Sequence, residues 1–239
     1  MAQKQDFFTT LGGRVKFTRG TYNPTCDAVW LAAFAAGNSP LAGESARAKR
    51  KPVGGYAVLD AGVGTGGASL CLLEHSSDLK ITGIDISEQM LAEAGANACL
   101  NGRDMEFIHG DIFTWRTNRT FDIVVTNPPY FKGTPRTGNP HHNIDLTLWT
   151  RACLKHVRPD GYFYCIVDAA ATAEVGAALH SGRAGDINIV PLFGGAKTAE
   201  RVLISARLGS RGGTKIHAGL SMNDDKILRD GELITINRK

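Results

Sequence analysis

The sequence of 239 residues has no long apolar run. No uninterrupted stretch approaches the roughly 18 apolar residues of a membrane-spanning helix, and the start of the chain carries no charged segment that leads into an apolar one. Its five cysteines are widely spaced and form no Cys-x-x-Cys pair: Cys26, Cys71, Cys99, Cys153 and Cys165. These absences predict a cytoplasmic protein with reduced cysteines, without a membrane span, a disulfide framework or a bound metal.

A strong charge of either sign is also lacking. The net charge of +4 and the isoelectric point near 8.8 are compatible with a nucleic-acid substrate but do not require one. One basic run comprises Arg47, Lys49, Arg50 and Lys51, and a second basic cluster comprises Arg201, Arg207, Arg211 and Lys215. For either set, a solvated surface is the more common interpretation and contact with phosphates is the alternative.

The chain divides into two unequal parts. Residues 1–53 predict a short N-terminal cap with a strand near 13–18, a helix near 28–36 that Thr25 or Asp27 caps, and a basic linker. Residues 54–239 alternate strands and helices, which is typical of an α/β domain with a mostly parallel sheet covered on both faces. We expect two later strands, near 187–190 and 201–206, to pair antiparallel because their connection is too short for a crossover helix. The tail from residue 215 is compatible with another short hairpin.

A glycine-rich turn follows the first strand of the larger part, in Asp60-Ala61-Gly62-Val63-Gly64-Thr65-Gly66. Glycine lets the backbone approach a ligand closely, and the amides at the start of the next helix then face it. Asp85, at the end of the next strand, lies where a carboxylate accepts the two hydrogens of a ribose diol. The alternative for Asp85 is a helix-capping role.

The tetrapeptide Asn127-Pro128-Pro129-Tyr130 follows the apolar run Phe121–Thr126. Two prolines stiffen the turn and remove two backbone donors, so its carbonyls remain available. The Asn127 side-chain oxygen and the Pro128 carbonyl can both accept from one NH2 group, which stabilises the pyramidal form of a planar nitrogen during methyl transfer. The Tyr130 ring can stack on a flat substrate. An ordinary turn is the alternative interpretation.

The glycine-rich loop resembles motif I of S-adenosylmethionine-dependent methyltransferases with the Rossmann-like, class I fold. This resemblance implies S-adenosyl-L-methionine as the cofactor and a seven-stranded, mostly parallel sheet with a C-terminal antiparallel strand. It also implies that Asp111 contacts the adenine amino group of the cofactor, where a loop or cap role is the alternative. The implied cofactor-binding residues are Asp60, Gly62, Gly64, Gly66, Asp85, Ile86, Asp111, Ile112 and Asn127.

With the Asn-Pro-Pro-Tyr turn in place, the chain resembles amino-group methyltransferases that modify adenine or the glutamine amide of peptide-chain release factors. Segments 11–15, 26–33 and 201–210 make it most similar to the bacterial tRNA1(Val) adenine-N6 methyltransferases. This resemblance implies N6-methylation of an adenine in RNA, with the anticodon-loop adenine of tRNA(Val) as the expected target. The alternatives are N5-methylation of a release-factor glutamine, methylation of another RNA amino group such as one in rRNA, and an RNA-binding module without catalysis.

The release-factor enzymes carry a substantial N-terminal helical domain, whereas about fifty residues precede Asp60 here, which argues for the RNA substrate. The predicted catalytic residues are Asn127, Pro128, Pro129 and Tyr130, and the predicted substrate contacts are Asn127, Tyr130, Phe131, Lys132 and His142. Adjacent His141 and His142 suggest metal ligands, but no carboxylate or cysteine pattern completes a site. The preferred interpretation is a loop that closes over the target, with Lys132 or Arg136 toward phosphate. Monomer and homodimer both remain open.

Overall fold

A computed structural model describes residues 7–20, 23–38, 41, 55–129 and 144–236. Its strands are β1 (Phe7–Thr10), β2 (Val15–Thr18), β3 (Ala57–Ala61), β4 (Lys80–Asp85), β5 (Glu106–His109), β6 (Phe121–Thr126), β7 (Val157–Asp168), β8 (Ala184–Phe193), β9 (Arg201–Leu208), β10 (Thr214–Ile216) and β11 (Leu220–Ser221). Its α-helices are α1 (Cys26–Asn38), α2 (Gly67–His75), α3 (Glu88–Leu100), α4 (Leu146–Leu154), α5 (Thr172–Ser181) and α6 (Asp225–Leu228). Two short 3-10 helices are η1 (Leu11–Gly13) and η3 (Ala169–Ala171).

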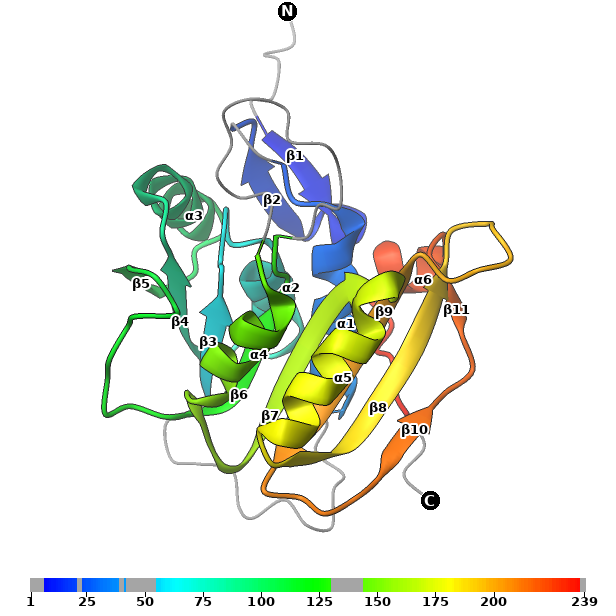
Figure 1. Ribbon diagram of the computed structural model, residues 1–239. Coiled ribbons are helices and arrows are strands. Elements are labelled where there is room, and N and C mark those ends of the chain that lie inside the picture. The colour runs from blue at the N-terminus through cyan, green and yellow to red at the C-terminus, as the bar shows by residue number, and fades with distance from the viewer. Residues whose placement is uncertain (1–6, 21–22, 39–40, 42–54, 130–143, 237–239) are drawn as a thin grey trace, which may run out of the picture.

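The main sheet has the order β10-β8-β9-β7-β6-β3-β4-β5, with β11 also paired to β8 (Figure 1). Strands β3 to β7 are parallel, and β9 runs antiparallel to both β7 and β8. The predicted α/β architecture and the antiparallel pair near the C-terminus are therefore confirmed. The tail differs from the hairpin expectation, because β10 and β11 each pair in parallel with β8 and extend the seven strands to nine.

Local sequence signals explain the best-predicted elements. Strand β6 ends where Asn127 introduces the two prolines, which cannot continue a ladder. Helix α3 begins after Ser87, whose hydroxyl accepts from the Met90 amide at 3.3 Å, as an N-cap does. Asp145 caps α4 in the same way by accepting from the Leu148 amide at 3.0 Å.

Two hydrophobic cores cover the two faces of the sheet. One core contains most of α1 and α2 together with β2, and its largest side chains include Trp30 and Phe34, both fully buried. Phe34 packs edge-to-face on Tyr164 of β7, with ring centroids 5.7 Å apart. The other core lies under α4 and α5, including Trp149, Phe163 and Leu179. Helix α1 spans Cys26–Asn38, longer than predicted at both ends, and is almost entirely buried.

The β1–β2 hairpin lies at the end of the sheet toward which β3 and β4 run (Figure 1). Two asparagines of α3 attach it. Asn101 accepts from the Lys16 amide at 2.8 Å and donates to the Lys16 carbonyl at 2.7 Å. Asn97 accepts from the Thr18 amide at 2.9 Å and donates to the Thr65 carbonyl at 3.0 Å. The Asn97 amide therefore links the hairpin to the glycine-rich loop.

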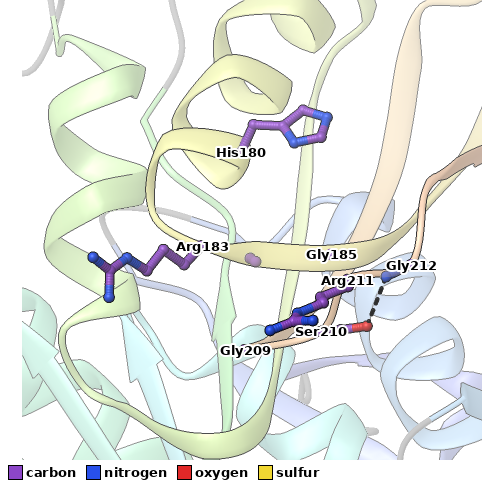
Figure 2. A pocket seen from close by; sticks show the side chains of 8 residues that line it. His180, Arg183, Gly185, Gly209, Ser210, Arg211 and Gly212 are labelled. Atoms are coloured by element: carbon purple, nitrogen blue, oxygen red, sulfur yellow. Dashed lines mark hydrogen bonds between the residues drawn. The ribbon is translucent and has the colours of Figure 1, made fainter.

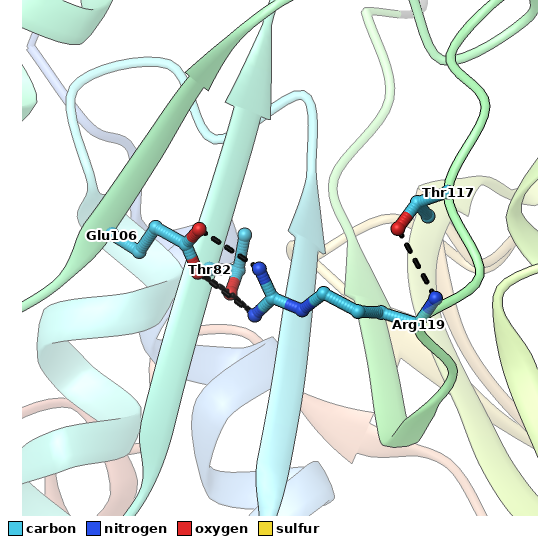
Figure 3. A network of polar contacts seen from close by, with 4 residues as sticks. All are labelled: Thr82, Glu106, Thr117 and Arg119. Carbon is cyan, nitrogen blue, oxygen red and sulfur yellow. Dashed lines mark hydrogen bonds and ion pairs between the residues drawn. The ribbon is translucent and has the colours of Figure 1, made fainter.

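The outer strands β4 and β5 are joined by a polar network (Figure 3). Arg119 donates to both carboxylate oxygens of Glu106 at 2.8 Å, and the Thr82 hydroxyl also donates to Glu106 at 2.8 Å. The hydrogen bonds from Arg119 are the main cause that lowers the pKa of Glu106. The network fastens the loop before β6 to the sheet.

Within the described ranges, no helix is long and apolar enough to cross a membrane.

Candidate functional site

Four loops of the predicted site leave the same end of four neighbouring parallel strands. The strand order β5-β4-β3-β6 places the segment containing Asp111, then Asp85, the glycine-rich loop and Asn127 side by side. The register pairs Asp60 with Val125, so the backbone of Asn127 begins two residues beyond the last paired position. Ligands of open α/β sheets bind beyond such carboxyl ends. The structure therefore places the segments predicted to bind the cofactor next to the Asn127 turn, which is predicted to bind the methyl-accepting group.

The glycine-rich loop requires glycine at three positions. Gly62, Gly64 and Gly66 have φ values of 74°, 52° and 85°, in the left-handed region that side chains disfavour. The Gly62 amide donates to the Ile84 carbonyl at 2.9 Å, which fixes the loop to the end of β4. A Cβ on Gly64 would meet no atom within 4 Å, so the outer surface of the turn is open for close approach of a ligand.

Asp85 supports this loop with its carboxylate. One oxygen accepts from the Gly64 amide at 2.9 Å, and the other accepts from the Ser87 amide at 2.9 Å. Ser87, rather than Asp85, caps α3 with its side chain. A carboxylate has about four acceptor sites, so Asp85 keeps capacity for a diol at its remaining lone pairs. Contact between Asp85 and a ribose stays a prediction.

Asp60 lies beneath the loop and not on its open surface. Its side chain is buried at 2% exposure and accepts from the Ser69 hydroxyl at 2.6 Å. Burial raises the pKa of Asp60 to about 6, and the nearby charge of Asp85 acts in the same direction. Asp60 therefore connects β3 to the first turns of α2, and its proposed cofactor role, if direct, has to come from its backbone.

The segment after β5 forms a side-chain turn. One Asp111 oxygen accepts from the Phe113 amide at 2.9 Å, which is the local role that competes with the predicted adenine contact. Ile112 is buried at 5% exposure, whereas Ile86, the residue immediately after β4, is 56% exposed. The exposed Ile86 side chain lies next to Asp85 in sequence and offers an apolar surface for a planar ring.

The turn Asn127-Pro128-Pro129-Tyr130, called the acceptor turn below, is described as far as Pro129. Pro128 is buried, and Asn127 and Pro129 are half-buried. Among the described residues, the Asn127 carboxamide forms no hydrogen bond, so its donor and acceptor groups are not used by the surrounding fold. Six residues predicted to act with the acceptor turn lie outside the described residues: Tyr130, Phe131, Lys132, Arg136, His141 and His142.

The two basic clusters noted in the sequence differ in what the structure describes. The run Arg47, Lys49, Arg50 and Lys51 lies outside the described residues. In the second cluster, Arg201 pairs with Asp27 at 3.2 Å and Arg207 pairs with Asp160 at 2.8 Å. These two ion pairs give Arg201 and Arg207 structural partners. Among the described residues, no group of His, Cys, Asp and Glu is arranged to hold a metal ion.

Sequence reasoning missed Trp149 and Thr126. Trp149, on α4, is 7% exposed, and its indole Nε1 donates to the Thr126 hydroxyl at 3.0 Å. A Cβ on Gly62 would lie 3.2 Å from the Trp149 ring. The available signal was a rare tryptophan in a short helix that follows the acceptor turn, but sequence spacing cannot indicate which loops it contacts.

A pocket lies elsewhere, at the opposite end of the sheet, and Figure 2 shows the side chains that line it. Its lining includes His180, Arg183 and Arg211 together with Gly185 near the start of β8. Strand β8 is parallel to β7, because both are antiparallel to β9, so the start of β8 lies at the amino ends of the strands. This pocket is therefore separate from the loops that carry the predicted chemistry.

The chain is similar in sequence to known methyltransferases. A family model described as "Methyltransferase domain" matches residues 58–161. The tRNA1(Val) (adenine(37)-N6)-methyltransferase of Glaesserella parasuis is 27% identical over 112 residues, covering 44% of this chain and 48% of that protein. The release factor glutamine methyltransferase of Deinococcus radiodurans is 36% identical over 112 residues, covering 46% of this chain and 38% of that protein. The chain thus spans less than half the length of either relative.

Solved structures share the fold. A predicted O-methyltransferase from Agrobacterium tumefaciens has a TM-score of 0.64 at 20% identity, covering 89% of this chain and 99% of that one. The T. thermophilus 16S rRNA N2 G1207 methyltransferase, in complex with AdoMet and guanosine, has a TM-score of 0.56 at 17% identity, covering 84% and 50% of the two chains. The described fold is that of class I methyltransferases. Together with the matched domain, it implies S-adenosylmethionine as the cofactor.

Proposed function

We propose that the chain transfers a methyl group from S-adenosylmethionine to the N6 nitrogen of an adenine in RNA, with the anticodon-loop adenine of tRNA(Val) as the preferred target. The observation that carries the proposal is the position of Asn127. Its carboxamide has no hydrogen bond among the described residues and follows β6, beside the loop that follows β3. Glycine-rich backbone for a cofactor and free acceptors for an amino group therefore lie on neighbouring strands.

The residues fit this cofactor. The loop is held by backbone contacts from Ile84 and by the Asp85 carboxylate, and its glycines leave room for a ligand against the main chain. The exposed Ile86 side chain suits one face of an adenine ring, and the Asp85 lone pairs suit the ribose hydroxyls. The bound cofactor supplies an electrophilic methyl group on a sulfonium.

The chain's contribution to the reaction is positioning. The lone pair of an exocyclic adenine nitrogen is delocalised into the ring, so it becomes nucleophilic only as the NH2 group turns pyramidal. In the proposed arrangement, the Asn127 oxygen and the Pro128 carbonyl accept the two hydrogens of that group. These two acceptors would hold the hydrogens while the nitrogen takes the methyl group that the cofactor would supply, and the nitrogen would then lose one proton to water. Near-attack alignment can lower such barriers by roughly 7–11 kcal/mol.

The RNA substrate is supported by the segments that carry the family resemblance. Segment 11–15 forms η1 and the start of β2, segment 26–33 lies in α1, and segment 201–210 contains β9. In the fold, segments 26–33 and 201–210 contact each other through the ion pair between Asp27 and Arg201. These segments lie outside the matched domain of residues 58–161, so they add support that is independent of the general methyltransferase match.

Glutamine methylation is the second candidate. It is favoured by the higher identity to the release factor glutamine methyltransferase, 36% against 27% over the same number of residues. A glutamine amide also presents a planar NH2 group, so Asn127 would act on it in the same way.

Labelled methyl transfer from S-adenosylmethionine separates the two. The purified protein is given unmodified tRNA(Val) and, in parallel, a release factor. We expect N6-methyladenosine in the digested tRNA and no label on the release factor. Label on the release-factor glutamine, with none on tRNA, would contradict the proposal and support the second candidate.

A further inference from the structure

Three segments of the candidate site contact one side chain, the indole of Trp149 in α4: the glycine-rich loop, the turn after β5 and the last residue of β6. A Cβ on Gly62 would lie 3.2 Å from ring atom Cζ2, so the indole lies against the glycine-rich loop. Phe113, two residues after Asp111, packs edge-to-face on the indole with centroids 5.8 Å apart. The third contact is a hydrogen bond to Thr126, the residue before Asn127.

The hydrogen bonds at Trp149 form a buried chain with a fixed direction. The indole Nε1 donates to the Thr126 hydroxyl at 3.0 Å, and this hydroxyl donates to the Ala61 carbonyl at 2.7 Å. Trp149, Thr126 and Ala61 are 7%, 1% and 0% exposed. An indole N–H can only donate, so the Thr126 hydroxyl has to accept from it and give its single hydrogen to Ala61. Water does not compete for these groups.

These side-chain hydrogen bonds begin where the backbone pairing between β3 and β6 ends. The register between β3 and β6 runs from Val58 and Ile123 to Asp60 and Val125. Ala61 and Thr126 are the next residues on each strand, and they immediately precede Gly62 and Asn127. The Thr126 hydroxyl thus bridges the two strands at the point where they separate into the proposed donor loop and acceptor turn.

We infer that Thr126, held by Trp149, is a positioning residue that sets the distance between the cofactor loop and the Asn127 turn. The inference rests on the proposed function of these two loops. Neither residue touches the reacting atoms in this role. Each acts by fixing the backbone that carries Gly62 and Asn127, and a displacement of about 1 Å at a reacting centre can cost on the order of a hundredfold in rate.

The test compares variants that differ in one hydroxyl. Thr126→Val keeps the side-chain shape and removes both hydrogen bonds, whereas Thr126→Ser keeps the hydroxyl. We expect Thr126→Val to lower kcat about ten- to a hundredfold, and Thr126→Ser to restore most of it. Thr82→Val is the matched control, because Thr82 is an equally buried threonine on β4 whose hydroxyl bonds to Glu106 outside the site (Figure 3). It should leave kcat unchanged.

A purely structural role for Thr126 predicts a different pattern. In that case Thr126→Val and Thr82→Val would both lower the melting temperature and leave kcat at low temperature near the wild-type value, which would overturn the inference. Trp149→Phe removes the indole donor together with the outer ring that lies against Gly62, and it leaves the hydrogen bond from Thr126 to Ala61 in place. We expect a smaller loss of kcat from it than from Thr126→Val, which provides a second readout if Thr126→Val does not fold.

A double-variant cycle gives the sharpest result. If Thr126 acts partly by placing the Asn127 side chain, then Thr126→Val should cost less kcat in the Asn127→Ala background than in the wild type, whereas fully multiplicative effects would contradict the inference. The acceptor is identified with wild-type protein alone, so absence of tRNA methylation there contradicts the proposed function. The ratio of kcat between Thr126→Val and Thr126→Ser, and the cycle of Thr126→Val with Asn127→Ala, are measured on whichever acceptor the wild type methylates. These two measurements test the positioning role separately from the identity of the substrate.

Discussion

The Arg201 Nε atom lies 3.2 Å from a carboxylate oxygen of Asp27, a residue 174 positions earlier in the chain. Asp27 is 6% exposed in the first turn of α1, and Arg201 begins β9. A second carboxylate, Asp168 at the end of β7, lies 3.7 Å from the same guanidinium. The arginine thereby ties the N-terminal helix to the carboxyl end of the sheet.

Arg201→Met should lower the free energy of unfolding by about 1–3 kcal/mol, because the buried Asp27 carboxylate loses a charged donor. Urea denaturation measures it. The control is Arg229→Met, whose ion pair with Asp225 is exposed on both sides at 74% and 73% and should contribute little. Equal losses from the two variants would show that the Asp27 pair contributes no more than a surface pair.

Asn127→Ala should reduce kcat by about a hundredfold, or ~2.7 kcal/mol, because it removes an acceptor at a centre where charge develops. Cofactor affinity, measured by calorimetry with S-adenosylhomocysteine, should remain within a fewfold of the wild-type value. Asn223→Ala, in the exposed turn before α6, is the matched control. Near-normal turnover of Asn127→Ala would rule out the acceptor-turn mechanism.

Asp85→Ala should weaken cofactor binding by about 1.5–3 kcal/mol for each charge-assisted hydrogen bond lost. It also removes the acceptor of the Gly64 amide, so part of the effect comes through the loop. Asp85→Asn keeps one oxygen and should weaken binding less. The exposed Asp104→Ala is the control. Calorimetry that gives identical cofactor affinity for Asp85→Ala and the control would remove Asp85 from the site.

Asp60 should make stability depend on pH. Burial raises its folded-state pKa from 3.8 to about 6, so the folded protein binds this proton more tightly than the unfolded chain does. The contribution to stability is complete below about pH 4 and is lost as the pH rises through about 6.

Asp60→Asn cannot ionise, so between pH 4.5 and 7.5 the wild type should lose roughly 1–3 kcal/mol relative to this variant. Urea denaturation across that range measures the difference. Ser69→Ala should move the wild-type transition to higher pH, because the Ser69 hydrogen bond lowers the pKa of Asp60. Parallel curves for the wild type and Asp60→Asn would contradict the assignment.

Gly62→Ala should lower cofactor affinity at least tenfold and stability by about 1–2 kcal/mol, because residue 62 has a left-handed φ of 74° and a Cβ there would lie 3.2 Å from Trp149. Gly176→Ala provides the opposite expectation. Gly176 lies inside α5, and a Cβ added there would meet no atom within 4 Å, so alanine should stabilise the protein by about 0.5–1 kcal/mol. A thermal shift assay with and without S-adenosylhomocysteine distinguishes the two.

Local patterns predicted those elements whose boundaries are set by neighbouring residues. Strand β6 was bounded by its prolines, and α3 by the Ser87 cap. Helix α5 was not predicted, because its alanines and the central Gly176 give no clear apolar stripe before tertiary contacts form. The parallel strands β10 and β11 were also missed, since three exposed residues and two residues carry almost no periodic signal.

The candidate site also contains features that local sequence predicts and features that depend on tertiary packing. The placement of Gly62, Asp85 and Asn127 at the carboxyl ends of neighbouring strands could be predicted, because each stands at a fixed place in a sequence motif next to a strand end. Trp149 could not, because its contacts with Gly62 and Thr126 depend on how α4 packs on the sheet. The buried position of Asp60 could not be predicted either, because a carboxylate in a glycine-rich motif gives no sign of which surface of the loop it faces.

The two short strands β10 and β11 have a consequence for solubility. They occupy the outer edge of β8, a ten-residue strand that would otherwise present a row of unpaired amides and carbonyls at the end of the sheet. Exposed edges of this kind template pairing with other chains. A protein shortened within residues 211–221 would keep every loop of the candidate site and yet expose this edge, so we expect its defect to be self-association.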